Sequence, residues 1–121
     1  MKPIFLFLAC AVAAPVLMAA EAETGTISYY SSAYNGRTTF CKDTFSNDKM
    51  TAAHRSLPCG TRLRVTNTKN DKSVFVTVTD RGPTIKSRGL SVTKAAASQL
   101  GFVKAGLTEA KFEVVQEKAQ R

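Results

Sequence analysis

The stretch that decides the fold is TAAHRSLPCGT at residues 51–61, followed by TDRGP at residues 79–83. It contains His54, the only histidine of the chain. Glycine and proline mark tight turns beside His54 and beside Asp80. The chain between these two residues is long enough for two strands that return to the same place. The stretch therefore predicts one site that contains His54 and Asp80, although a packed, hydrogen-bonded histidine is the alternative reading of His54.

The N-terminus has the composition of a secretory signal peptide. A positively charged start and an uncharged apolar run precede Ala20 and Ala22, the small residues expected at positions −3 and −1 of a cleavage site. The run is short for a membrane span and is interrupted by Pro15. We therefore predict a signal peptide at residues 1–22 and one domain at residues 23–121. An N-terminal anchor that stays in place is the alternative.

Cysteine use agrees with export. The chain has three cysteines, of which Cys10 lies in the predicted signal peptide. Lipid attachment at Cys10 is the less favoured alternative, because the apolar run before it is short. Cys41 and Cys59 remain, and an even number of cysteines in an exported chain indicates a disulfide. Two cysteines and one histidine without CxxC spacing do not predict a metal site, and no other cofactor is expected.

The chain is strongly basic. It has 17 Lys and Arg against 9 Asp and Glu, a net charge of +8. Such a charge attracts polyanions, and outside a bacterial inner membrane these are anionic envelope polymers and lipid phosphates. The predicted export argues against nucleic acid, the usual partner of a basic cytosolic chain. The prediction is a periplasmic or secreted monomer. Solubility alone is the alternative, because the charges are scattered.

Short β-strands dominate the expected secondary structure. They are predicted at residues 25–30, 62–67, 73–79 and 111–115, and the middle two form a hairpin. A short helix is expected at residues 93–101, with Thr93 as N-cap and Gly101 just past its end. Many short strands with glycine and proline turns suggest a small closed barrel or a sandwich. Periodicity alone does not choose between them.

From Ser28 to Val115 the sequence resembles the double-psi β-barrel domain of the rare lipoprotein A (RlpA) family. The matching segments, in the order and spacing of the family, are SYY at 28–30, TAAHR at 51–55, LP at 57–58, GT at 60–61, RVTN at 64–67, DRGP at 80–83, AA at 95–96 and LG at 100–101. The resemblance implies an all-β fold with one or two short helices, a six-stranded double-psi β-barrel. It also implies a lytic transglycosylase that cleaves peptidoglycan glycan strands and prefers glycan without stem peptides.

Cleavage of a glycosidic bond needs an acid for the leaving oxygen and stabilisation of an oxocarbenium-like transition state. A lytic transglycosylase uses the sugar's own C6 hydroxyl as nucleophile, so the same acid can then act as the base. The family has its acid, a glutamate, eleven residues before the histidine, and Asp43 stands there. The resemblance implies that His54 orients or polarises a substrate group. It implies that Asp80 stabilises positive charge or holds a sugar hydroxyl.

Other candidate site residues surround these three. Tyr29 and Tyr30 are candidates for stacking on sugars, although one of two adjacent strand residues must point inward. Arg81 either binds an acidic sugar group or pairs with Asp80. Without the resemblance, Asp43 is a plain loop residue, and Asp80 caps the turn that follows it.

Five positions depart from the family pattern. Asp43 replaces glutamate, and Cys41 and Lys42 replace a small residue and glycine. Cys59 replaces an aromatic residue, and Ser91 stands where the family generally has aspartate. A Cys41–Cys59 pair would explain two departures together, because it would pin the acid-bearing loop to the loop that carries the histidine.

Three functions remain open on the sequence. The first is a lytic transglycosylase in which Asp43, His54 and Asp80 converge on one groove. The second is a non-catalytic wall-binding protein like the expansins, which the shorter acid and Ser91 favour. The third is a small basic protein that binds anionic envelope polymers by charge alone.

Overall fold

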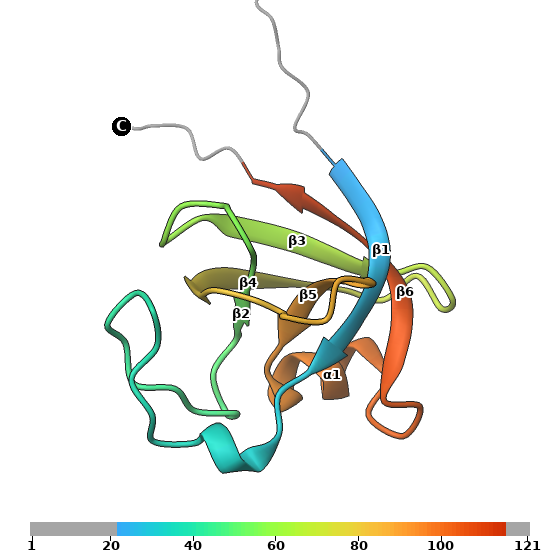
Figure 1. The fold of residues 1–121 in the computed structure, drawn as a ribbon. Coiled ribbons are helices and arrows are strands. Elements are labelled where there is room, and N and C mark those ends of the chain that lie inside the picture. The colour runs from blue at the N-terminus through green and yellow to red at the C-terminus, as the bar shows by residue number, and fades with distance from the viewer. Residues whose placement is uncertain (1–21, 116–121) are drawn as a thin grey trace, which may run out of the picture.

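Six strands close into a barrel in the computed structural model, which describes residues 22–115 (Figure 1). The elements, in chain order, are β1 (Ala22–Tyr29), the 3-10 turn η1 (Ser32–Tyr34), β2 (Thr51–Ala53), β3 (Arg62–Asn67), β4 (Ser73–Asp80), β5 (Arg88–Val92), α1 (Lys94–Leu100) and β6 (Leu107–Val114). The longest connection between strands joins β1 to β2, and it carries η1, Cys41 and Asp43.

The strand order around the barrel is β1-β5-β2-β4-β3-β6. β1 pairs with β5 and β2 pairs with β4 in parallel, and the other neighbours are antiparallel. Two parallel pairs need crossover connections, because a hairpin joins only antiparallel strands. This mixed closed barrel confirms the six-stranded double-psi fold and excludes the sandwich.

The β3–β4 hairpin forms as the sequence predicts. Leu63 and Val65 alternate with outward arginines on β3, and they face Val76 and Val74 of β4 in register. The turn between the strands places Asp71 in the left-handed region, with φ of 65°. Alternation of apolar and polar residues with a period of two is what one buried face of a sheet requires.

The helix also begins and ends where the sequence indicates. The Thr93 side chain accepts a hydrogen bond from the Ala96 amide, as an N-cap does. Gly101 ends α1 in the left-handed conformation, with φ of 81°. The helix buries Ala96, Ala97 and Leu100 against the barrel.

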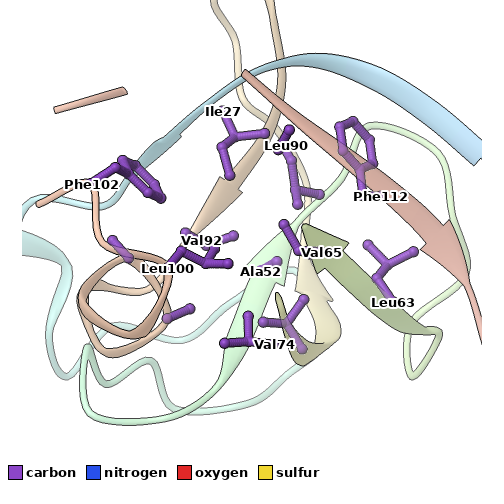
Figure 2. Close-up of a cluster of buried hydrophobic side chains, with 14 of the residues drawn as sticks. Ile27, Ala52, Leu63, Val65, Val74, Leu90, Val92, Leu100, Phe102 and Phe112 are labelled. Carbon is purple, nitrogen blue, oxygen red and sulfur yellow. The ribbon is translucent and has the colours of Figure 1, made fainter. Parts of the chain in front are cut away.

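The core fills the barrel with side chains from all six strands. Figure 2 shows Ile27, Leu90 and Phe112 together on one side of this core. Gly89 makes room for Phe112, because a Cβ at Gly89 would lie 2.8 Å from the Phe112 ring. Each fully buried side chain of this size stabilises the fold by roughly 1.5–3 kcal/mol.

Two strands were not predicted, and two others begin earlier than expected. β2 and β5 are short, and alanine, glycine and serine give them little β signal. β6 begins at Leu107 and β1 at Ala22, because tertiary pairing between them extends both. The predicted signal peptide, including Cys10, lies outside the described residues except for Ala22, the first residue of β1. No helix within residues 22–115 is long and apolar enough to cross a membrane.

Candidate functional site

A groove of about 230 Å³ opens where the chain leaves β1 and β4. Its lining comes from the ends of β1, β2 and β4, from η1, from the loop after β4 and from β5. Tyr29, Tyr30, Asp80 and Arg81 line it together, so the structure brings four of the predicted site residues to one place. Ser91 lines the same groove, at the position where the family generally has aspartate.

Asp80 is held from both oxygens. The Tyr30 hydroxyl donates to Oδ2 at 2.7 Å, and the amides of Phe40 and Arg81 donate to Oδ1 at 2.9 Å each. A carboxylate only accepts, so three donors suit its charged form and hold it in one orientation. The carboxylate is therefore a fixed negative group in the groove.

Tyr30 is the donor that this arrangement keeps protonated. Burial raises the pKa of Tyr30 well above its usual range, and the hydrogen bond and charge of Asp80 raise it further. Its ring packs against Phe45 at a centroid distance of 4.2 Å and against Tyr34 at 5.4 Å. Tyr29 turns differently, because its hydroxyl donates to the Val103 carbonyl and its ring meets Phe102. Of the two tyrosines, Tyr30 is therefore the one that binds Asp80.

Arg81 connects the groove with the segment that carries His54. Its Nη1 donates to the His54 carbonyl at 3.3 Å, and its guanidinium carbon lies 4.6 Å from the centre of the Phe40 ring. No ion pair joins Arg81 to Asp80 among the contacts of the described residues; the two meet through the Arg81 amide. Arg88 lies on the other wall, where Nη1 donates to the Ser28 hydroxyl at 3.4 Å.

His54 faces a second cavity, of about 470 Å³, with Leu57, Leu63 and Phe112 in its lining. Its backbone amide donates to the Asp80 carbonyl at 3.1 Å, so His54, directly after β2, lies beside Asp80, the last residue of β4. Their side chains nevertheless line different cavities. The predicted convergence of His54 and Asp80 therefore holds for their backbones only.

The tautomer of His54 follows from its contacts. Nδ1 accepts from the amides of Ser56 and Leu57, both at 3.1 Å. Nε2 therefore carries the hydrogen and donates to Glu23 Oε1 at 2.9 Å. His54 is only 7% exposed, and its ring holds the turn that follows β2.

Asp43 lies in the long loop between β1 and β2. Its backbone is anchored on Thr39, whose amide donates to the Asp43 carbonyl at 2.7 Å. Its side chain is 44% exposed, with Oδ1 at 3.8 Å from Lys49 Nζ. Asp43 lines neither of the two cavities. Lys49 is its cationic neighbour.

A disulfide joins the loop of Asp43 to the segment after His54. The sulfurs of Cys41 and Cys59 are 2.00 Å apart. The Cys41 amide donates to the Thr79 carbonyl, and the Gly60 amide donates to the Val78 carbonyl. Both ends of the disulfide are thus fixed along the last residues of β4, next to Asp80.

Among the groove residues that sequence reasoning missed are Tyr34 and Arg88. Tyr34 lines the groove from η1 and is 44% exposed. The spacing of Tyr30 and Tyr34 in one loop was a usable signal. Arg88 carried no signal, because β5 itself was not predicted. Among the described residues, no three His, Cys, Asp or Glu side chains form a possible metal site.

The fold and the groove define a double-psi β-barrel protein with a fixed carboxylate between aromatic and cationic walls. A family model described as lytic transglycolase matches residues 22–112. The chain therefore belongs to the lytic transglycosylase family of RlpA-like double-psi β-barrels.

Named relatives agree with this assignment. The chain is 45% identical over 93 residues to the endolytic peptidoglycan transglycosylase RlpA of Neisseria meningitidis, covering 77% of this chain and 39% of the relative. It is 36% identical over 100 residues to the RlpA of Campylobacter jejuni, covering 83% of this chain and 36% of the relative. The chain thus spans well under half the length of these relatives.

A solved structure shares the fold. The expansin of Clavibacter michiganensis superposes with a TM-score of 0.67 at 26% identity, covering 83% of this chain and 53% of the expansin.

Proposed function

We propose that this chain is a lytic transglycosylase that cleaves peptidoglycan glycan strands in the groove around Asp80. The observation that carries the proposal is the Asp80 carboxylate, held by three donors between Tyr30 and Arg81. Positive charge develops on the sugar in an oxocarbenium-like transition state. A carboxylate that is already oriented stabilises this charge without reorganisation during the reaction. The C6 hydroxyl of the sugar is the nucleophile, and an anhydro-sugar is the product.

Asp43 is the proposed acid that protonates the leaving oxygen. Its loop is fixed next to Asp80 by the Phe40 amide and by the Cys41–Cys59 disulfide. An aspartate is one methylene shorter than the glutamate of the family, and an error of about 1 Å in position can lower a rate on the order of a hundredfold. We therefore expect weaker cleavage than a relative with glutamate gives.

We assign His54 a positioning role. Its ring holds the turn after β2 through the amides of Ser56 and Leu57. The His54 carbonyl accepts a hydrogen bond from Arg81, and the His54 amide donates one to the Asp80 carbonyl. These contacts support a histidine that shapes the wall of the groove, whereas its ring lies in the other cavity.

The substrate preference that we propose is for glycan without stem peptides. Removal of a stem peptide from muramic acid hydrolyses an amide and leaves a free lactyl carboxylate. Arg81 and Arg88 line the groove, and guanidinium groups bind carboxylates through paired hydrogen bonds. Amidase-treated sacculi should therefore be cleaved faster than untreated sacculi, and the difference should shrink as salt screens these charges.

A second candidate function is glycan binding without cleavage. Two observations favour it: Asp43 lines neither cavity and lies beside Lys49, and the groove has Ser91 in place of an acid. Binding would then use the same aromatic and cationic walls.

Product chemistry separates the two functions. Purified protein is incubated with denuded sacculi, and anhydromuramic ends are measured by mass spectrometry while pelleting reports binding. We expect Asp43→Asn to abolish release and to leave pelleting intact, because it removes the proton with little change of shape. Asp43→Glu should maintain or increase release. Release from Asp43→Asn at the wild-type rate would show that another group is the acid. Binding without release by wild type at every pH would establish the second function.

We also propose that the protein is periplasmic or secreted, as a monomer that the net charge of +8 attracts to anionic envelope polymers. Removal of residues 1–22 would leave Glu23, the partner of His54, as the first residue. The mass of the protein isolated from the cell envelope tests this, because retention or lipidation of Cys10 gives a larger mass. Light scattering tests whether the protein is a monomer in solution.

A further inference from the structure

Phe40 is the most exposed of the large apolar side chains in the described part of the chain, at 59%. A single exposed apolar residue is ordinary on a protein surface. The surroundings of Phe40 are not ordinary, because its own amide is one of the donors that hold Asp80. Its ring is therefore presented to solvent directly beside the groove.

Hydrogen bonds and a disulfide fix the backbone at Phe40 and at the residues on either side of it. The Phe40 amide is bound to Asp80 Oδ1 at 2.9 Å, and the next amide, of Cys41, is bound to the Thr79 carbonyl at 3.1 Å. Cys41 is in turn joined to Cys59. On the other side, the Thr39 amide is bound to the Asp43 carbonyl. An exposed ring on such a backbone loses little conformational freedom when it binds a ligand, which increases affinity.

The ring is also paired with a cation of the groove. The guanidinium carbon of Arg81 lies 4.6 Å from the centre of the Phe40 ring, and Arg81 lines the groove. This contact joins the ring to the groove wall and orients the guanidinium. One of its N–H groups is bound to the His54 carbonyl, and a guanidinium has further N–H groups for hydroxyl or carboxylate oxygens.

A second exposed aromatic residue is linked to the other oxygen of Asp80 through Tyr30. Tyr34 is 44% exposed, lines the groove, and packs on Tyr30, which binds Oδ2. Tyr34 and Phe40 are thus linked to opposite oxygens of one carboxylate. A chain that is cleaved at Asp80 needs contacts for the sugars on both sides of the scissile bond.

We propose that the Phe40 ring, oriented with Arg81, is an additional pyranose-binding platform that extends the groove beyond Asp80. Its ligand is a sugar ring of a glycan chain, whose C–H face packs on the aromatic face while its hydroxyl or carboxylate oxygens meet Arg81. The proposal rests on the glycan-acting function proposed above. It names a residue that determines the length of glycan chain that the groove binds.

The test uses fragments of denuded glycan of two lengths, a disaccharide and a hexasaccharide, with affinity measured by calorimetry. Wild type should bind the hexasaccharide more tightly. Phe40→Ala should weaken hexasaccharide binding roughly three- to tenfold, the usual effect of one aromatic contact, and should leave disaccharide binding unchanged. Phe40→Tyr should behave as wild type, because it retains the aromatic face.

The chain offers a matched control. Phe75 is 49% exposed, and the guanidinium carbon of Arg62 lies 5.4 Å from the centre of its ring, but it is on the outer face of the hairpin. Phe75→Ala should leave both affinities unchanged. Equal hexasaccharide affinity in wild type and Phe40→Ala would overturn the platform while the glycan-acting function stands. Absence of any binding by wild type would overturn both.

Discussion

The two cavities of this barrel lie on either side of one backbone contact, and they differ in size and lining. The larger, of about 470 Å³, is lined mainly by apolar side chains and by His54. The smaller, of about 230 Å³, contains Asp80, Tyr30, Arg81 and Arg88. The His54 amide and the Asp80 carbonyl are hydrogen-bonded between them. Convergent polar groups, and not volume, mark the place where chemistry is expected.

The comparison also separates two kinds of polar group. Asp80 lines the polar groove, and its two oxygens accept hydrogen bonds from Tyr30, Phe40 and Arg81. Each nitrogen of His54 is occupied within the protein, by two amides and by Glu23. Asp80 is therefore placed to act on a ligand, and His54 is placed to hold the structure.

The largest effect is expected when Asp80, the carboxylate of the smaller cavity, is substituted. Asp80→Asn removes the negative charge and turns an N–H₂ group toward one of three donors. We expect cleavage of denuded sacculi to fall about a hundredfold or more, and the free energy of unfolding to fall by about 1–3 kcal/mol. Asp71→Asn, in the exposed hairpin turn, is the matched control, because asparagine tolerates its left-handed φ of 65°. Cleavage by Asp80→Asn at the wild-type rate would place the site elsewhere.

A smaller effect is expected for substitutions of His54, which test whether its role is structural. His54→Ala leaves the amides of Ser56 and Leu57 without their acceptor, so we expect the free energy of unfolding to fall by about 2 kcal/mol. His54→Asn can present an oxygen near the position of Nδ1, and it lacks Nε2. We expect it to recover most of the stability and the cleavage rate. A stable, glycan-binding His54→Asn protein without cleavage would instead give Nε2 a chemical role.

The smallest effect concerns Tyr30 and pH. Burial and Asp80 raise the pKa of Tyr30, so folding favours its protonated form. This contribution is complete below the unfolded value of about 10. As the pH rises past that value, tyrosine ionises in the unfolded chain while Tyr30 retains its proton, and the free energy of unfolding falls.

Denaturant titrations of wild type and Tyr30→Phe at neutral pH and above pH ~10 measure this difference. The variant should lose less stability over that range, because it has no proton to lose at this position. Parallel losses in the two proteins would mean that other groups, such as the lysines, cause the whole effect.

Much of the fold followed from local patterns. The hairpin was predictable because Leu63, Val65, Val74 and Val76 alternate with polar residues. The helix was predictable because Thr93 and Gly101 are standard caps. β2 and β5 were not, since Ala52, Ala53 and Gly89 are chosen by close packing inside the barrel and not by β-propensity.

The structure brings some of the predicted site residues together and separates others. Asp80, Arg81 and Tyr30 were identified from short motifs, and the structure brings them together. His54 was identified by the same motifs, yet its ring faces the other cavity. Phe40 was missed, because an aromatic residue in an irregular loop has no periodicity to read.

Sequence by itself determined the family and the residues at the tight turns, because these depend on motif order and turn chemistry. The closed β-barrel followed from the family resemblance, since alternation alone left barrel and sandwich open. Tertiary structure alone decided which cavity each side chain enters. The pairing of Ala53 with Asp80 brings His54 and Asp80 side by side through their backbones. Their side chains then separate, because the direction of a side chain depends on strand register and local twist, which no short motif records.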